Sequence, residues 1–148
     1  MDLVPIKENA DDNEEFINNP ACVETIFMTI DFFKKIGYKA PWIGYYARDN
    51  NILVGAGAFK GAPQNNTVEI AYGTFQSHRK KGIGTKICDL LVELALKTDP
   101  GLTITARTLP EKNFSTKILQ KNGFVLSGLV NDPEDGDLWE WVYQTKQL

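Results

Sequence analysis

Apolar residues recur at helical spacing in three stretches of the chain. The stretches cover residues 19–37, 83–95 and 113–121, and each is expected to form an amphipathic helix. The apolar face of the first helix is expected to comprise Val23, Ile26, Phe27, Ile30 and Phe33. Pro100-Gly101 breaks the second helix and Asn122-Gly123 ends the third, because Gly and Pro terminate helices.

Six apolar runs outside these helices predict strands, at residues 42–48, 52–59, 67–75, 102–108, 124–129 and 138–143. Asp49-Asn50-Asn51 is expected to form the turn between the first two strands, and the acidic segment 132–137 joins the last two. Antiparallel strands followed by a strand–helix–strand connection predict a mixed sheet in an α+β fold. Glu69 lies in the middle of the third strand, where a carboxylate is unusual.

Composition favours one globular domain and excludes several kinds of site. The 148 residues, of which 43% are hydrophobic and 24% charged, predict a single domain over residues 1–148. A formal net charge of −3 gives no general attraction to nucleic acid. Cys22 and Cys88 are too few for a disulfide framework, and His78 is the single histidine. We therefore expect no metal site.

The beginning of the chain shows neither a targeting pattern nor a membrane span. No cationic region followed by an apolar run is present near Met1, and no apolar stretch approaches the ~20 residues that a span requires. A cytoplasmic location without a membrane partner is therefore expected. The first two dozen residues are acidic; they form either a solvated helical or loop surface, or an acidic wall beside a site for cationic substrates.

The most informative segment is the loop between the third strand and the second helix. It reads His78-Arg79-Lys80-Lys81-Gly82-Ile83-Gly84-Thr85. A helix start presents unpaired N–H groups and the positive end of the helix dipole. Gly82 and Gly84 allow close approach of the backbone to a ligand, and the basic side chains add charge. This combination fits a pyrophosphate, although a plain loop-to-helix turn is the alternative.

Two common phosphate loops do not match. The chain has no GxxxxGK[ST] segment, and the GxGxxG fingerprint fails because Ile87 stands where a third glycine is needed after Gly82 and Gly84. Gly55 and Gly57 fail in the same way at Lys60.

Arg79-x-x-Gly82-x-Gly84 resembles the acetyl-CoA pyrophosphate motif of the GCN5-related N-acetyltransferase (GNAT) superfamily. Two further segments agree. The stretch from Thr108 to Phe124 is similar to the later family motif, in which an Asn and a Ser precede a Gly-Phe pair. Val68-Glu69-Ile70-Ala71-Tyr72-Gly73 is similar to the strand before the pyrophosphate loop in the branch that includes ribosomal-protein N-terminal acetyltransferases. The resemblance covers residues 42–141.

The resemblance implies a mostly antiparallel, twisted sheet with a splayed central parallel strand pair, flanked by helices. It also implies acetyl-CoA as co-substrate and direct acetyl transfer to a primary amine. The residues that it assigns to the cofactor are Tyr72, Gly73, Thr74, Phe75, Arg79, Lys80, Lys81, Gly82, Ile83, Gly84, Thr85 and Asn113. For Asn113 the alternative is a helix cap.

Two residues are candidates for catalysis. Glu69 matches a frequent strand glutamate of the family and is the candidate general base; a structural carboxylate paired with a basic side chain is the alternative. Many relatives carry a tyrosine as acid for the leaving thiolate, and this chain has Leu119 there. Ser115 is the candidate substitute, unless its hydroxyl caps the helix.

The acceptor is expected to be a small-molecule amine or a peptide N-terminus. The N-terminal helices, the strand near residues 42–46 and the last hairpin loop line the acceptor site in this family. Acidic residues in the first and last of these segments favour a cationic amine. A non-catalytic acyl-CoA-binding module and a nucleotide-dependent enzyme with an irregular phosphate loop remain alternatives. The protein is expected to be a monomer or a homodimer.

Overall fold

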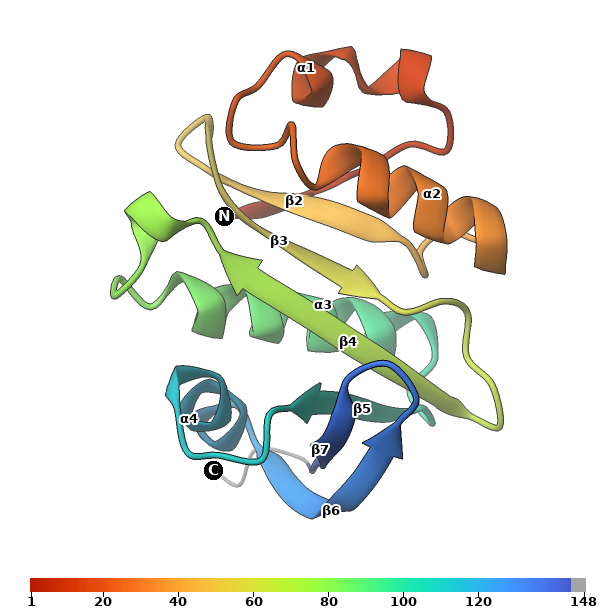
Figure 1. The fold of residues 1–148 in the computed structure, drawn as a ribbon, viewed down its shortest axis with the longest axis vertical. Helices are drawn as coiled ribbons and strands as arrows, with labels where there is room; N and C mark the ends of the chain where they lie inside the picture. The colour runs from red at the N-terminus through yellow and green to blue at the C-terminus, as the bar shows by residue number, and fades with distance from the viewer. Residues whose placement is uncertain (145–148) are drawn as a thin grey trace.

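The computed structural model describes residues 1–144, and its seven strands form one sheet (Figure 1). The strands are β1 (Asp2–Pro5), β2 (Gly44–Asp49), β3 (Ile52–Phe59), β4 (Thr67–Thr74), β5 (Thr103–Thr108), β6 (Phe124–Asp132) and β7 (Gly136–Tyr143). The α-helices are α1 (Glu14–Ile17), α2 (Ile26–Ile36), α3 (Ile83–Thr98) and α4 (Phe114–Lys121). Two short 3-10 helices, η1 (Ala10–Asn13) and η2 (Gln76–His78), complete the secondary structure.

The sheet has the order β1-β2-β3-β4-β5-β7-β6, and all neighbours are antiparallel except β4 and β5. The parallel pair is in register only from Thr67↔Thr103 to Ile70↔Ala106. Beyond that point β4 continues to Thr74 and β5 to Thr108 without pairing to each other. The predicted mixed sheet with a splayed central parallel pair is therefore confirmed.

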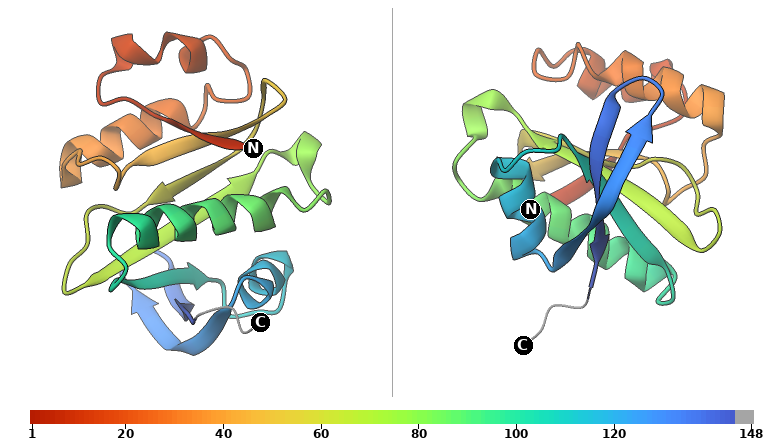
Figure 2. Two further views of the ribbon diagram at one scale, coloured as in Figure 1. Left: turned by 180° about the vertical axis from the view of Figure 1, so that it is seen from behind. Right: turned by 60° about the horizontal axis from the view of Figure 1, so that its bottom comes forward.

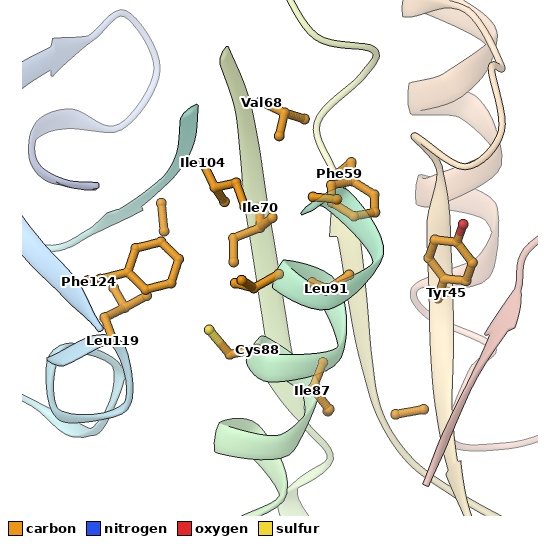
Figure 3. Close-up of a cluster of buried hydrophobic side chains, with 14 of the residues drawn as sticks. Tyr45, Phe59, Val68, Ile70, Ile87, Cys88, Leu91, Ile104, Leu119 and Phe124 are labelled. Carbon is orange, nitrogen blue, oxygen red and sulfur yellow. The ribbon is translucent and has the colours of Figure 1, made fainter. Parts of the chain in front are cut away.

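Helices cover the two faces of the sheet. On one face, α3 packs so closely on β3 that a Cβ atom at Gly57 would lie 2.9 Å from side-chain atoms of both Ile87 and Leu91. Figure 3 shows α3 side chains directed at strand residues in this core. On the other face, a Cβ at Gly44 would lie 2.8 Å from Thr29 of α2. The view from behind brings α3 to the front (Figure 2).

The N-terminal region departs from the sequence prediction. The strand β1 was not predicted, and α2 begins at Ile26 rather than at Asn19-Pro20. Asn19 accepts a hydrogen bond from the Ala21 N–H at 2.9 Å, which makes a local turn before the helix. Val23 precedes α2, and Phe27 lies in its first turn; they are 49% and 46% exposed and do not join the buried face of the helix.

The six predicted strands and the helices predicted at 83–95 and 113–121 agree with the structure to within three residues, whereas the short elements η1, α1 and η2 were not predicted. Asn50 and Asn51 both have positive φ angles, as a tight hairpin turn requires. The predicted single domain includes residues 145–148, which lie outside the described part of the chain. Among residues 1–144 no helix is long and apolar enough to cross a bilayer.

Candidate active site

A cleft of about 680 Å³ opens where β4 leaves β5. Its walls come from the end of β4, the basic loop, the first turn of α3 and the first turns of α4. The residues that line it are Tyr72, Gly73, Thr74, Arg79, Lys80, Gly82, Ile83, Gly84, Thr85, Asn113, Phe114, Ser115 and Ile118. Segments distant in the sequence thus meet in one cleft, and most residues predicted to bind the cofactor are among them.

The first turn of α3 presents backbone donors to this cleft. Gly82 is the N-cap, with φ 73° and ψ 12°, and no side chain caps the helix. Lys80 also has a positive φ of 68°. A Cβ at Gly82 would meet no atom within 4 Å, so the glycine serves the left-handed conformation rather than close packing. The uncapped N–H groups and the helix dipole create a site suited to an anion.

Gly84 is required for a different reason. A Cβ at this position would lie 2.9 Å from Cδ1 of Ile118 and 3.3 Å from Oγ1 of Thr74. Three elements that line the cleft, namely α3, α4 and β4, therefore meet at this glycine. Its missing side chain leaves the backbone of α3 close to both neighbours.

Asn113 caps the N-terminus of α4, which is the role given above as the alternative to cofactor binding. Its Oδ1 accepts the Thr116 N–H at 3.1 Å, and the Thr116 hydroxyl accepts the Asn113 N–H at 2.9 Å, forming a capping box. Because these two residues complete the cap, Ser115 is not needed for it. Among residues 1–144 the Ser115 hydroxyl has no hydrogen-bond partner, and Ser115 lines the cleft.

Two residues predicted for the cofactor do not line the cleft. The ring of Phe75 packs toward Tyr46 at a centroid distance of 6.2 Å, while the Phe75 N–H donates to the Val54 carbonyl at 2.9 Å. Lys81 is exposed on the loop but is absent from the cleft lining. Conversely, Phe114 and Ile118 line the cleft and were not predicted. No motif in the sequence marks them, because they are ordinary apolar positions of α4.

Tyr72 lies on the wall of the cleft, and its hydroxyl is buried beside Cys88 of α3. Burial raises the pKa of this phenol above its ordinary value. The neighbouring Cys88 thiol raises the pKa of Tyr72 further.

Glu69 is not in this cleft. It lies in a second pocket of about 490 Å³, which is lined in part by the C-terminal end of α2, the loop between β3 and β4, and Glu140 of β7. Its carboxylate is 3.4 Å from Nζ of Lys60 and 3.7 Å from Nε of Arg107. Glu69 thus has the ion pairs proposed for it as a structural carboxylate.

Arg107 is the centre of this charged cluster. Besides Glu69 it contacts Glu140 at 3.6 Å and Asp132 at 3.5 Å. One guanidinium thereby connects carboxylates from β4, β6 and β7. The sequence did not identify Lys60, Arg107 or Glu140, because their proximity depends on the strand register.

The two pockets share β4 as a common wall. The second pocket is lined by Thr67, Val68 and Glu69 at the beginning of β4. The first cleft is lined by Tyr72, Gly73 and Thr74 at its end. Alternate residues of a strand point to opposite faces. Glu69 pairs with Thr105 one position before the pairing of β4 with β5 ends. The charged cluster therefore lies next to the point where the strands separate.

Two acidic segments, the N-terminal stretch and the last hairpin loop, were expected near the acceptor. Asp132 accepts hydrogen bonds from the backbone N–H groups of Glu134 and Asp135 at 2.8 and 3.0 Å, which lowers the pKa of its carboxyl. It shapes the hairpin turn and holds Arg107 as well. No residue of the N-terminal acidic stretch or of segment 42–46 lines the second pocket. In the described part of the chain no group of His, Cys, Asp and Glu side chains could hold a metal ion.

Comparison with known proteins agrees with this geometry. The family model described as "Acetyltransferase (GNAT) domain" matches residues 2–125. An uncharacterized N-acetyltransferase of Bacillus subtilis (strain 168), YjdG, is 33% identical over 128 residues, which are 81% of this chain and 73% of that protein. The family match includes the N-terminal region that departs most from the sequence prediction.

Solved structures share the fold. AAC(6')-Ib in complex with ribostamycin and coenzyme A matches with a TM-score of 0.61 and 25% identity, over 70% of this chain and 64% of that chain. A chimera of the spermidine N-acetyltransferase SpeG from Vibrio cholerae and hSSAT matches with a TM-score of 0.70 and 12% identity, over 97% and 95%. The ribosomal L7/L12 alpha-N-protein acetyltransferase RimL matches with a TM-score of 0.67 and 15% identity, over 95% and 90%. GNAT enzymes use acetyl-CoA, which agrees with the predicted co-substrate. The chain belongs to the GNAT family and is an N-acetyltransferase.

Proposed function

We propose that this protein transfers an acetyl group from acetyl-CoA directly to a primary amine. The observation that supports this most strongly is the placement of a cleft and a charged pocket along β4, where β4 and β5 separate. A donor bound in the cleft and an amine bound in the pocket would meet at this separation.

The cleft fits acetyl-CoA in its shape and in its donors. The N–H groups of residues 80–85, with Arg79 and Lys80 beside them, suit the pyrophosphate. On the side facing β5, the backbone of residues 71–74 has no strand partner. An extended arm with amide groups can pair with such an edge as an added strand does. Tyr72 and Asn113 supply further polar groups at the wall.

Acetyl-CoA supplies the reactive thioester, and the chain must supply a group that takes a proton from the amine. A protonated amine cannot attack, so a base is needed. Glu69 is our candidate because it is the carboxylate nearest to the end of the β4–β5 pairing and faces the second pocket. Lys60 and Arg107 hold it in place. Glu140 lines the same pocket, and Lys39, Lys60 and Arg107 offset the charge of the two carboxylates there.

Ser115 is our candidate for stabilising the leaving sulfur. Its hydroxyl is free to donate into the cleft, whereas Leu119 is 1% exposed and belongs to the core. A hydroxyl that donates to a developing thiolate lowers its energy.

Calorimetric titration with acetyl-CoA, with ATP and NAD as controls, tests the donor assignment. We expect saturable binding of acetyl-CoA alone. Binding of ATP or NAD instead would identify a nucleotide-dependent enzyme and overturn the proposal.

Comparison of Glu69→Gln with Glu93→Gln tests the base. Glu93 is an exposed carboxylate on α3, so it serves as the matched control. We expect Glu69→Gln to retain acetyl-CoA affinity and to lose turnover, most strongly at neutral pH, where the amine is protonated. Equal turnover of both variants at every pH would exclude Glu69 as the base.

A further inference from the structure

Asn122 is a buried polar residue that lines neither pocket. It is 1% exposed and is the C-cap residue of α4, where its N–H group donates to the carbonyls of Ile118 and Leu119 at 3.0 and 3.2 Å. Its side chain contacts another helix: Nδ2 donates to the carbonyl of Thr85, in the first turn of α3, at 2.9 Å. The end of α4 is thereby connected to the beginning of α3.

The other polar atom of this side chain has no comparable role. Oδ1 of Asn122 is buried, and among residues 1–144 it has no hydrogen-bond partner. A buried acceptor without a partner costs free energy, and an apolar side chain at this position would avoid that cost. The hydrogen bond to Thr85 is therefore what Asn122 contributes and an apolar residue could not.

The first turn of α3 has little support within its own helix. Its N-cap residue, Gly82, is left-handed, and no side chain caps the turn. The first helical hydrogen bond, from the Lys86 N–H to the Gly82 carbonyl, is long at 3.3 Å. Helix ends fray readily, so the conformation of this turn depends on contacts with neighbouring elements.

The helix α4 supplies two such contacts, and it lies beside the beginning of α3 in the views from both sides (Figures 1 and 2). One contact is the hydrogen bond from Asn122. The other is the packing of Ile118 on Gly84, where a Cβ would lie 2.9 Å from Cδ1 of Ile118. Gly84 and Thr85 carry two of the N–H groups that the start of α3 leaves without a partner in the helix. The two contacts thus hold the residues that face the proposed anion site.

We propose that Asn122 is a positioning residue for the acetyl donor. Through its hydrogen bond to Thr85 it holds the first turn of α3 in the conformation that presents N–H groups to the pyrophosphate of acetyl-CoA. This inference rests on the proposed placement of the pyrophosphate at residues 80–85. Binding groups that are already in place need not be ordered when the ligand arrives, so the affinity is higher.

Two ligands separate this role from a general effect on stability. Coenzyme A carries the pyrophosphate, whereas pantetheine has the same thiol and amide groups and no phosphate. The measured quantity is the Kd of pantetheine, from an NMR titration, divided by the Kd of coenzyme A, from calorimetry. We expect Asn122→Ala to lower this ratio roughly 10-fold, which is the lower end of the effect of removing a residue that orients binding groups. The Kd of pantetheine should change little.

Asn13→Ala is the matched control, because Asn13 is also 1% exposed and lines neither pocket. Its side chain makes hydrogen bonds with Lys7 and Asn9 in the N-terminal region. We expect Asn13→Ala to lower the stability of the protein and to leave the ratio unchanged.

Asn122→Ser is the second variant, for the case that Asn122→Ala does not fold. Its hydroxyl ends one atom short of the position of Nδ2, so the bond to Thr85 is lost and the ratio should fall in the same direction. An unchanged ratio in a folded Asn122 variant, or an equal fall in Asn13→Ala, would overturn the inference.

Gly82→Asp separates this inference from its foundation. It places a charge in the anion site itself, so it should lower the ratio whether or not Asn122 acts on that site. A lowered ratio in Gly82→Asp with an unchanged ratio in Asn122→Ala would refute the positioning role and leave the proposed donor site standing. No binding of coenzyme A by the unchanged protein, or an unchanged ratio in Gly82→Asp, would refute the placement of the pyrophosphate.

Discussion

The ion pair between Arg107 and Glu69 offers a direct test of how the charged cluster is organised. Their closest atoms, Nε and Oε1, are 3.7 Å apart. Coulomb's law gives about 1.1 kcal/mol for that separation at the dielectric constant of water and about 4.5 kcal/mol at an effective value of 20. The side chains are 33% and 21% exposed, so solvent screens the pair strongly. The distance also exceeds that of a hydrogen bond.

We therefore expect a coupling energy of about 1 kcal/mol, close to the lower figure. A double-mutant cycle of Arg107→Gln and Glu69→Gln, with the free energy of unfolding in urea as the readout, measures it. Arg107→Gln alone removes three ion pairs and should cost ~1–2 kcal/mol. With a slope near 2 kcal/mol/M, the urea midpoint should fall by roughly 0.5–1 M.

Salt and a control cycle complete this test. The coupling should shrink in 1 M NaCl, because the screening length falls to about 3 Å. A cycle of Arg107→Gln with Glu93→Gln should show no coupling, since Glu93 lies on α3, outside the cluster. A coupling below ~0.3 kcal/mol at low salt would refute the assignment of Arg107 as the residue that holds Glu69.

Three other predictions follow from the cleft and the core. Gly82→Asp should weaken acetyl-CoA binding roughly 30-fold, because a charge meets the anion site and a side chain takes a left-handed φ; Gly82→Asn, titrated alongside, should lose only part of this. Ser115→Ala should lower kcat by ~10–100-fold with little change in acetyl-CoA affinity, whereas Ser127→Ala on β6 should change neither. Burial raises the pKa of Tyr45 and of Tyr46 to about 12, so the folded state holds these protons more tightly than the unfolded state, where Tyr titrates near 10. Stability should therefore be intact below pH 10 and fall between about pH 10 and 12, and urea midpoints that stay constant across this range would contradict the burial argument.

Much of the fold could be predicted because the local signals were strong. The periodic α3, the Asn50-Asn51 turn and the Asn122-Gly123 stop are each specified by a few neighbouring residues. The N-terminal region was harder. Asn19-Pro20 carries a helix-start pattern that also suits a turn, and β1 has only four residues, which is too short for a pattern of alternation.

The part of the candidate site that is contiguous in the sequence could be predicted. The part that combines residues from several strands could not. The loop from Arg79 to Thr85 is contiguous, so its glycines and basic residues indicated an anion site directly. Lys60, Arg107 and Glu140 meet Glu69 only because β3, β5 and β7 are placed in a certain register around β4. Contacts between residues on different strands depend on the register of the whole sheet, and no local sequence pattern reveals them.

The sharing of β4 by the two pockets has a kinetic consequence. If acetyl-CoA binds in the cleft and the amine in the second pocket, as proposed, each reactant has its own entrance and neither has to depart before the other arrives. Both would then be present together, and the acetyl group would pass directly from one to the other. Initial rates measured against both concentrations should then give intersecting rather than parallel lines in double-reciprocal plots. Coenzyme A would then leave through the cleft, and the acetylated amine would leave through the second pocket.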